Sequence, residues 1–307
     1  MPTSEPLLVI TNSDAGTSDD GPFSAALRIL AERTSVEVAA TGAPGELDSV
    51  LHRAGSRRII VAGGDGSIHA VVAALHRRAE LEGRVLGLLP SGTGNDFART
   101  LGISLDVEEA AHQLVDGRIT PMDVLVDEVG EVVVNNVHLG AGAEAGRRAV
   151  PWKERLGAVG IGPVNLGKLG YPIGAVLTAL DPPTVRAQVT VDDEVVADVD
   201  REILMVAVGN GKSVGGGTEL TPDADPGDGL LDVMIATPAS LRSRLGYAAR
   251  LPLGMHPGHG EVITTRGTTV SVRGSEFWCS ADGELYGPER HRTWRVEPGA
   301  YSMIVPA

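Results

Sequence analysis

The sequence predicts two domains: a doubly wound α/β domain followed by a mainly antiparallel β-sandwich domain. Over roughly the first 120 residues, short apolar runs rich in branched side chains alternate with segments of helical periodicity. Beyond that point the chain becomes a series of short strand-like runs joined by acidic or glycine-rich turns. A chain of 307 residues is also longer than one hydrophobic core usually supports, which favours the division into two.

The first domain is expected to alternate strands and helices. Apolar runs that end in glycine or a polar residue predict buried parallel strands, and apolar positions at helical spacing predict the helices that cover them. Asp106 is a suitable N-cap for the last of these helices, and Gly117 is a suitable stop. Strands are expected at 7–11, 36–41, 58–62 and 85–89, and helices at 22–31, 45–54, after each of two glycine-rich turns, and at 107–115.

The second domain is expected to be mainly β, with two helical interruptions near 168–180 and 240–251. We place the first domain at 1–122, with the last strand region, about 293–307, returning to it, and the second domain at 123–292. The strand-like runs of the second domain lie at 124–126, 132–139, 185–191, 203–208, 230–235, 262–265 and 268–272.

Composition limits the possible partners and the compartment. A net charge of −14 and a pI near 5.0 argue against nucleic acid as a partner, because binding to a phosphate backbone needs a basic surface. The single cysteine, Cys279, excludes an intrachain disulfide and is expected to be a small buried residue rather than a nucleophile. No apolar run approaches the ~18 residues of a membrane span and no secretory signal is evident, so we expect a cytoplasmic protein.

Two stretches depart from the acidic average. Residues 146–180 contain five basic side chains and one acidic one, and residues 240–260 contain Arg242, Arg244 and Arg250 with no acid. These stretches are either solvated helix faces or a docking surface for lipid headgroups, with Trp152 as an interfacial aromatic. The second interpretation predicts peripheral contact with the inner face of a membrane. A homodimer is kept as one alternative for the oligomeric state.

Two glycine-rich turns directly follow predicted strands: GGDGS at 63–67 and PSGTGNDF at 90–97. In an open parallel sheet, ligands bind beyond the carboxyl ends of the strands, where backbone N–H groups and helix N-termini favour anions. Glycine lets the main chain approach a phosphate closely. Asp65, Thr93, Asn95 and Asp96 add hydroxyl, amide and carboxylate groups suited to phosphate, ribose or a magnesium-bound water. The pair of turns therefore predicts a nucleotide site.

Other motifs carry less information. GNGKS at 209–213 ends like a P-loop but has Val206 where the first glycine is required, and GAGAEA at 140–145 lies outside any βαβ unit. HExxH, paired CxxC and GxSxG motifs are not found, so zinc hydrolysis and serine-elbow hydrolysis are without support.

The two turns resemble the signature of the diacylglycerol kinase catalytic-domain family, which includes bacterial soluble lipid kinases, sphingosine kinases and ceramide kinase. The resemblance continues in order along nearly the whole chain. It includes Asp123 with Asn135 and a glycine turn at 140–142; a triple glycine at 215–217 before Pro222, Ala224 and the DGLLD run at 228–232; and DGE at 282–284.

The resemblance implies a kinase that uses ATP and Mg²⁺ to transfer the γ-phosphate to a lipid hydroxyl, most simply converting diacylglycerol to phosphatidic acid. It makes Glu284 the general base, with Asp65 and Asp123 helping to hold the catalytic magnesium. It also implies a second, structural metal site made by Asp225, Asp228 and the carbonyl of Leu230. The nucleotide-binding residues that it implies are Asn12, Gly63, Gly64, Asp65, Gly66, Ser67, Ser91, Gly92, Thr93, Asn95 and Asp96.

The loop after the first strand departs from the family pattern. Many relatives have Asn-Pro-x-Ser-Gly followed by a basic residue there, whereas residues 11–20 read TNSDAGTSDD. This departure leaves open either a substitute cation that neutralises the γ-phosphate, for which Arg99 and Arg147 are candidates, or an altered nucleotide preference. Two alternatives remain open: a non-catalytic, nucleotide-responsive lipid-binding protein, and a kinase of a soluble acceptor, as in the NAD kinases that share the GGDG turn.

Overall fold

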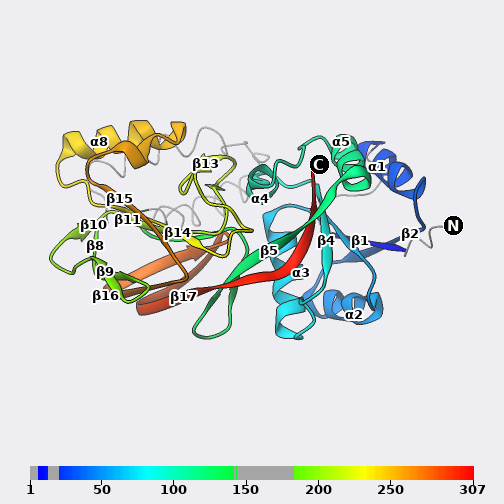
Figure 1. Cartoon of the computed structure of the whole chain (residues 1–307), viewed down its shortest axis with the longest axis horizontal. Helices are drawn as coiled ribbons and strands as arrows, with labels where there is room; N and C mark the ends of the chain where they lie inside the picture. Colours follow the sequence, from blue (N-terminus) through cyan, green and yellow to red (C-terminus); the bar gives the residue numbers. More distant parts are fainter. Residues whose placement is uncertain (1–5, 13–20, 142, 144–182) are drawn as a thin grey trace, which may run out of the picture.

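The computed structural model describes residues 6–12, 21–141, 143 and 183–307. Figure 1 shows two lobes side by side, each built around its own hydrophobic core. The predicted helix at 168–180, the basic stretch 146–180, Trp152 and Arg147 lie outside the described residues. No helix in the described part of the chain is long and apolar enough to span a bilayer.

The first lobe is a parallel sheet with helices on both faces. Its strands lie in the order β2-β1-β3-β4, and all neighbours are parallel. Helices α1 and α5 pack together on one face, and α2 and α3 cover the other (Figure 1). The doubly wound α/β prediction is therefore confirmed. The elements are β1 (Leu7–Asn12), α1 (Gly21–Ala31), β2 (Val36–Thr41), α2 (Pro44–Ala54), β3 (Ile59–Gly63), α3 (Asp65–Arg77), β4 (Val85–Pro90), α4 (Asp96–Thr100) and α5 (Val107–Asp116).

Local sequence explains how these elements begin and end. Every residue of β3 is buried, as the apolar run predicts for a central parallel strand. The Asp106 carboxylate accepts hydrogen bonds from the amides of Glu108 and Glu109 at 3.0 Å each, so the predicted N-cap of α5 is confirmed. Gly117 follows the last residue of this helix.

The second lobe is mainly antiparallel. Its strands run in the order β15-β14-β11-β7-β16-β17, and β8 pairs with β16 and carries β9 and β10. The prediction of a mainly antiparallel β domain is confirmed. The elements are β5 (Arg118–Asp127), β6 (Val132–Val133), β7 (Asn136–Gly140), β8 (Val185–Val191), β9 (Glu194–Ala197), β10 (Glu202–Ile203), β11 (Met205–Gly209), β12 (Ser213–Val214), β13 (Thr218–Glu219), β14 (Leu231–Ala236), α8 (Leu241–Arg250), η2 (Leu251–Leu253), η3 (His256–Gly258), β15 (Val262–Gly267), β16 (Thr269–Ala281) and β17 (Glu284–Val305).

Strand β17 connects the two lobes. It has 22 residues and pairs first with β16, then antiparallel with β5, and finally parallel with β4 through Ser302↔Val85 and Met303↔Leu86. A strand was expected only from about residue 293, because residues 284–292 are polar, contain Pro288 and lack an apolar alternation. Pairing with β16 makes residues 284–292 a strand, although their own sequence does not predict one. The domain boundaries at 122 and 292 stay predictions.

Cys279 lies within the second core. It is buried, and burial raises the pKa of its thiol to about 11, so the thiol stays protonated near neutral pH. The expectation of a small buried residue is confirmed.

Candidate active site

The two glycine-rich turns meet at the carboxyl ends of β3 and β4. The Ser91 amide donates to the Gly63 carbonyl at 3.1 Å. A Cβ atom placed on Gly92 would lie 2.5 Å from the Cα atom of Gly64, which is closer than side-chain atoms come to a backbone. Glycine at both positions therefore lets the turns form one continuous surface.

Asn95 closes the second turn on itself. Its backbone is left-handed, with φ 52°, and its side chain both accepts from the Gly92 amide at 3.0 Å and donates to the Gly92 carbonyl at 2.8 Å. The Asn95 side chain therefore stabilises the turn through both of its polar atoms. Ser91 and Thr93 of the same turn are exposed.

The two aspartates of the turns have different surroundings. Asp65, half-buried at the start of α3, accepts from the Phe97 amide at 2.9 Å through Oδ1, and burial raises its pKa. Asp96 is 4% exposed, and its two oxygens accept from the amides of Gly216 at 2.9 Å and Gly217 at 2.7 Å. Both glycines have positive φ. Asp96 therefore fastens the triple-glycine loop of the second lobe to the first lobe.

A cleft of about 520 Å³ lies beside the first turn. Gly64, Gly66 and Ser67 line it from the start of α3, and Asn12 lines it from the end of β1. Across the cleft, Glu284 and Tyr286 come from β17 and Glu131 from the loop between β5 and β6. The structure thus brings the predicted general base and the first predicted phosphate turn to one cavity. The cleft lining does not include Gly63, Asp65, Asp123 or residues 91–96.

The turn that carries Glu284 is held by the aspartate before it. The Asp282 carboxylate accepts from the amides of Val134 at 2.7 Å, Asn135 at 2.9 Å and Asn136 at 3.1 Å. Glu284 itself is exposed, and the Tyr286 hydroxyl donates to its Oε2 at 3.0 Å. The two acids of the DGE sequence therefore have different surroundings: Asp282 anchors the turn to β7, and Glu284 faces the cleft.

Asp123 has a different environment. It is 2% exposed, and its oxygens accept from the amides of Gly299 at 2.8 Å and Gly229 at 2.7 Å. Burial, with Asp228 and Asp225 nearby, raises its pKa despite these two bonds. This carboxylate joins β5 to β17 and to the loop before β14. Its predicted role in holding the catalytic magnesium stays a prediction.

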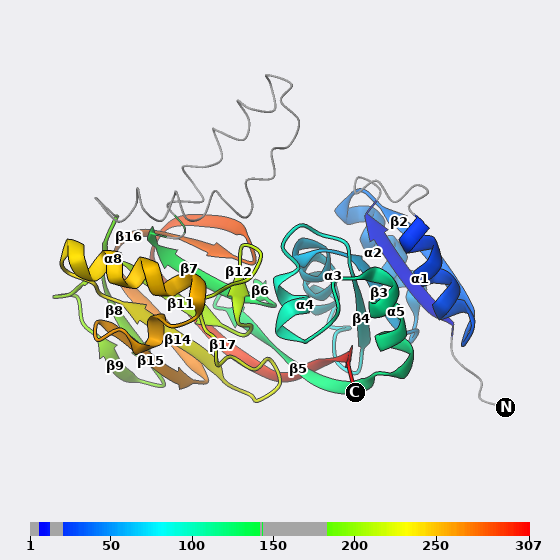
Figure 2. The same cartoon turned by 90° about the horizontal axis from the view of Figure 1, so that it is seen from above.

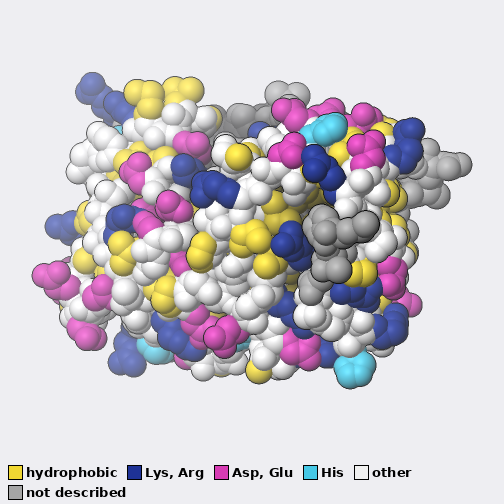
Figure 3. Space-filling model, turned by 45° about the vertical axis from the view of Figure 1, so that its right-hand side comes forward, with side chains coloured by type: hydrophobic (Ala, Val, Ile, Leu, Met, Phe, Trp, Pro, Cys, Tyr) yellow, Lys and Arg dark blue, Asp and Glu magenta, His cyan; other side chains and the backbone are white. Residues whose placement is uncertain are grey.

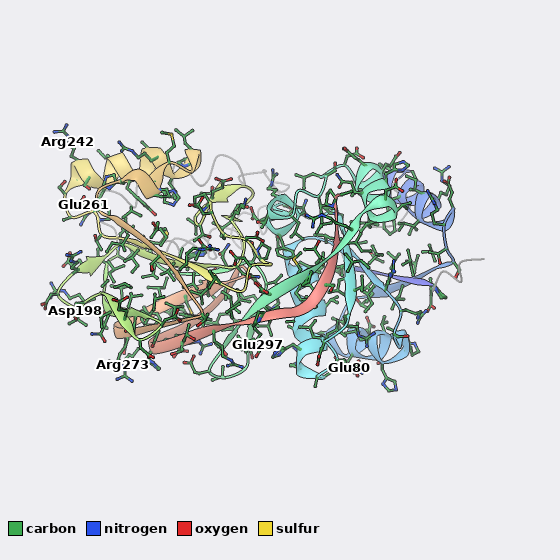
Figure 4. All side chains as sticks on the ribbon, viewed as in Figure 1. Glu80, Asp198, Arg242, Glu261, Arg273 and Glu297 are labelled. Atoms are coloured by element: carbon green, nitrogen blue, oxygen red, sulfur yellow. The ribbon has the colours of Figure 1, made fainter. Side chains whose placement is uncertain are left out.

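Asp123→Asn is expected to destabilise the protein by about 1–3 kcal/mol, because the amide that replaces one oxygen cannot accept a backbone N–H at this buried site. Urea unfolding measures the loss. Asp198→Asn is the matched control, since Asp198 is exposed at the rim of the second lobe (Figure 4) and should change stability little. Equal stability of the two variants would show that the buried hydrogen bonds of Asp123 contribute little.

An arginine side chain pairs with one of the residues of the predicted second metal site. Arg266 on β15 is the cross-strand partner of Asp232, and its Nε donates to Asp232 Oδ2 at 3.2 Å. Its Nη2 pairs with Asp228 Oδ2, and Asp228 Oδ1 accepts from the Leu230 amide at 3.0 Å. A magnesium ion at Asp225, Asp228 and the Leu230 carbonyl would have to compete with this guanidinium for Asp228. The described residues gather no group of three or more His, Cys, Asp or Glu side chains suited to a metal ion.

If the guanidinium of Arg266 neutralises this acidic loop, Mg²⁺ and EDTA should leave the melting temperature of the wild-type protein unchanged. Arg266→Gln removes the cation and leaves Asp228 and Asp232 unpaired. We expect Mg²⁺ to raise the melting temperature of this variant, because the freed carboxylates are hard oxygen ligands. Arg273→Gln, an exposed arginine on β16 (Figure 4), is the control. A melting temperature that rises with Mg²⁺ in the wild type would contradict the expectation.

The cleft contains side chains that the sequence analysis did not single out. His69, Glu131 and Tyr286 all line it. Two of them carry a local signal: His69 lies four residues after Asp65 on one face of a helix, and Tyr286 lies two residues after Glu284 on one face of a strand. Glu131 reaches the cleft only through the β5–β6 turn. Of the two proposed substitute cations, Arg99 does not line the cleft and donates to the Gly94 carbonyl at 3.3 Å. Arg147 lies outside the described residues.

Comparisons with known proteins agree with this fold. Residues 6–126 match the diacylglycerol kinase catalytic domain, and residues 158–305 match the YegS C-terminal NAD kinase beta sandwich-like domain. A "Probable lipid kinase YegS-like" protein of Cronobacter sakazakii (strain ATCC BAA-894) is 31% identical over 279 residues, covering 88% of this chain and 86% of its own length. A "Diacylglycerol kinase" of Bacillus subtilis (strain 168) is 33% identical over 234 residues, covering 75% and 71%.

A solved structure has the same architecture. The crystal structure of a diacylglycerol kinase from Bacillus anthracis str. Sterne aligns with a TM-score of 0.72 at 22% identity and covers 98% of this chain and 97% of that one. The fold and the family matches are those of a lipid kinase. The chain belongs to the diacylglycerol kinase catalytic-domain family, together with the YegS-like lipid kinases.

Proposed function

We propose that this lipid kinase uses ATP and Mg²⁺ to phosphorylate a lipid hydroxyl, most simply that of diacylglycerol. The observation that carries the proposal is the shared cleft, with Glu284 on one wall and the GGDGS turn on the other. A carboxylate facing a phosphate-binding turn suits in-line phosphoryl transfer, which needs positioning and a base near the attacking oxygen.

In the proposed step, the lipid hydroxyl oxygen attacks the γ-phosphorus of ATP while Glu284 takes the hydroxyl proton. The new bond joins the lipid oxygen to phosphorus, the bond between the γ-phosphorus and its bridging oxygen breaks, and ADP leaves. The start of α3 and the glycine turn before it, which line the cleft through Gly64, Gly66 and Ser67, would receive the phosphates. Asp65 lies at the start of α3, next to the cleft residues Gly64 and Gly66. It would hold the Mg²⁺ that neutralises charge on the phosphates.

The test is transfer of radiolabel from γ-labelled ATP to lipids in mixed micelles. We expect label in the lipid phase with diacylglycerol as acceptor, and Asp65→Asn should abolish it. Ceramide, sphingosine, polyprenol and NAD are assayed in parallel. Label on NAD alone would support the kinase of a soluble acceptor, and binding of ATP and lipid without transfer would support the non-catalytic alternative.

Access to a membrane lipid requires a surface that approaches the bilayer. The segment formed by α8, η2 and η3 has three arginines and no acid between residues 240 and 260, although the chain carries a net charge of −14. Hydrophobic and basic side chains gather over this helix (Figure 3), and Arg242 points away from the body of the protein (Figure 4). Four large apolar side chains of the segment are 45–69% exposed: Leu241, Leu245, Leu253 and Met255. We propose that this segment contacts anionic lipid at the inner face of the membrane.

Sedimentation with vesicles measures this contact. The protein should bind phosphatidylglycerol-containing vesicles, less so at high salt, and Leu253→Asp should weaken binding. Val195→Asp is the matched control, because Val195 is also a large exposed apolar residue, 53% exposed, but lies on β9 outside the segment. Transfer to a short-chain, water-soluble diacylglycerol should be unaffected by Leu253→Asp. Equal binding of both variants would exclude this segment as the contact.

A further inference from the structure

His69 faces the cleft and has an acid behind it. It lies on α3, four residues after Asp65, and its Nδ1 is 2.7 Å from Asp282 Oδ2. The His69 side chain is 14% exposed and the Asp282 side chain 3%. Because Asp282 also accepts three backbone amides, its carboxylate is held in one orientation, and the imidazole is held with it. Figure 2 shows α3 at the boundary between the two lobes, where this bond joins them.

The hydrogen bond to Asp282 leaves the second ring nitrogen for a ligand. An ionised carboxylate only accepts, so Nδ1 of His69 carries a proton. None of the described residues forms a hydrogen bond with Nε2 of His69. Nε2 is also not fully buried, so a ligand can reach it. An imidazole that lines the cleft with Gly66 and Ser67 can therefore donate through Nε2 to an anion on the first turn.

The charges around His69 favour its protonated form. Burial lowers the pKa of the imidazole, but the hydrogen bond and charge of Asp282, with Glu284 and Glu131 nearby, outweigh it and raise the pKa. The facing groups are thus acids from three places: the β16–β17 turn, β17 and the β5–β6 loop. Apart from His69, Arg77 is the one cationic side chain among the described residues that line the cleft, and it lies at the other end of α3.

The sequence departure in the loop after β1 favours a role for such a cation. Residues 13–20 contain three aspartates and no lysine or arginine, where many relatives place a basic residue. A triphosphate bound at the GGDGS turn needs positive charge near its terminal group for transfer to proceed. We infer that the imidazolium of His69, held by Asp282, supplies a charged hydrogen bond to the terminal phosphate of the nucleotide. This inference rests on the proposed function.

The kinetic test compares two histidines of the same helix. His76 also pairs with an acid, Glu297, whose place on β17 is shown in Figure 4, but it does not line the cleft. We expect His69→Gln to lower kcat by a factor on the order of 10²–10³, as loss of a transition-state donor does, and His76→Gln to leave it unchanged. Wild-type activity should fall as pH rises through the raised pKa of His69, and His69→Gln should lack this limb. Equal kcat and equal pH profiles in the two variants would overturn the inference.

A binding measurement separates this inference from the proposed function. In the wild-type protein, the ¹⁵N resonance of His69 Nε2 should shift on addition of a non-hydrolysable ATP analogue and much less on addition of ADP, because only the former carries the terminal phosphate. His76 should not respond. Equal shifts with both nucleotides would exclude contact with the terminal phosphate. Failure of the wild type to phosphorylate any lipid would refute the proposed function but leave this result intact.

Discussion

Glu284→Gln is expected to lower kcat for lipid phosphorylation by a factor on the order of 10²–10⁴, the contribution typical of a positioned general base. The amide keeps the size of the side chain and its contact with the Tyr286 hydroxyl, but it cannot accept a proton at neutral pH. KM for ATP should change little, because the residue acts on the lipid hydroxyl. Initial rates at saturating ATP measure the effect.

The chain offers a matched control for this variant. Asp192-Asp193-Glu194 forms a second turn of the same spacing in the β8–β9 hairpin, and Asp192 has the same positive φ as Asp282, 45° against 46°. Asp192 anchors its turn by accepting from the amides of Thr268 and Thr269. Glu194 is exposed and is not among the cleft residues, so Glu194→Gln should leave kcat unchanged. Full activity of Glu284→Gln would show that Glu284 is not the general base.

Gly92→Ala is expected to destabilise the first lobe by about 1–3 kcal/mol and to weaken nucleotide binding at least tenfold. The new methyl group would lie 2.5 Å from the Cα atom of Gly64 and 2.9 Å from Asn95 Oδ1, so the two turns must separate. The first neighbour is backbone, which cannot rotate away. Thermal unfolding and calorimetric titration with ATP measure the two effects.

Gly66→Ala controls for the loss of a glycine in the same region. A Cβ atom at Gly66 meets nothing within 4 Å, and the residue lies in the first turn of α3. Its melting temperature should equal or exceed that of the wild type, because alanine loses less backbone entropy than glycine in a helix. A Gly92→Ala variant as stable as Gly66→Ala would mean that the turns can move apart at no cost.

The acids of this lobe junction divide into two groups. Asp96, Asp123 and Asp282 each use both oxygens to accept backbone amides, so they fix loops in place. Asp65 and Glu284 are the acids for which we propose a chemical role, on magnesium and on the lipid hydroxyl. The four aspartates are chemically identical, but their hydrogen-bond partners differ in the structure. The two groups predict different phenotypes: loss of stability for Asp123→Asn, and loss of turnover with an intact fold for Glu284→Gln.

Several features follow from the sequence because they depend on neighbouring residues. The strand–turn–helix units around residues 63–67 and 90–97, the cap at Asp106 and the DGE turn all rest on local spacing. The family resemblance predicted that Glu284 acts together with the GGDGS turn, and both line the cleft. The early part of β17 was missed because its order comes from pairing with β16 rather than from its own polar sequence.

By itself, the sequence determined the fold class, the two glycine-rich turns and the kinase family, since periodicity, glycine placement and motif order are properties of the chain itself. Only the tertiary structure decided which acids face the cleft, and that Arg266 reaches Asp228 and His69 reaches Asp282. His69 and Asp282 are 213 positions apart. No local pattern encodes such a contact, because it depends on how β17 crosses from one lobe to the other and brings the turn at its start against α3.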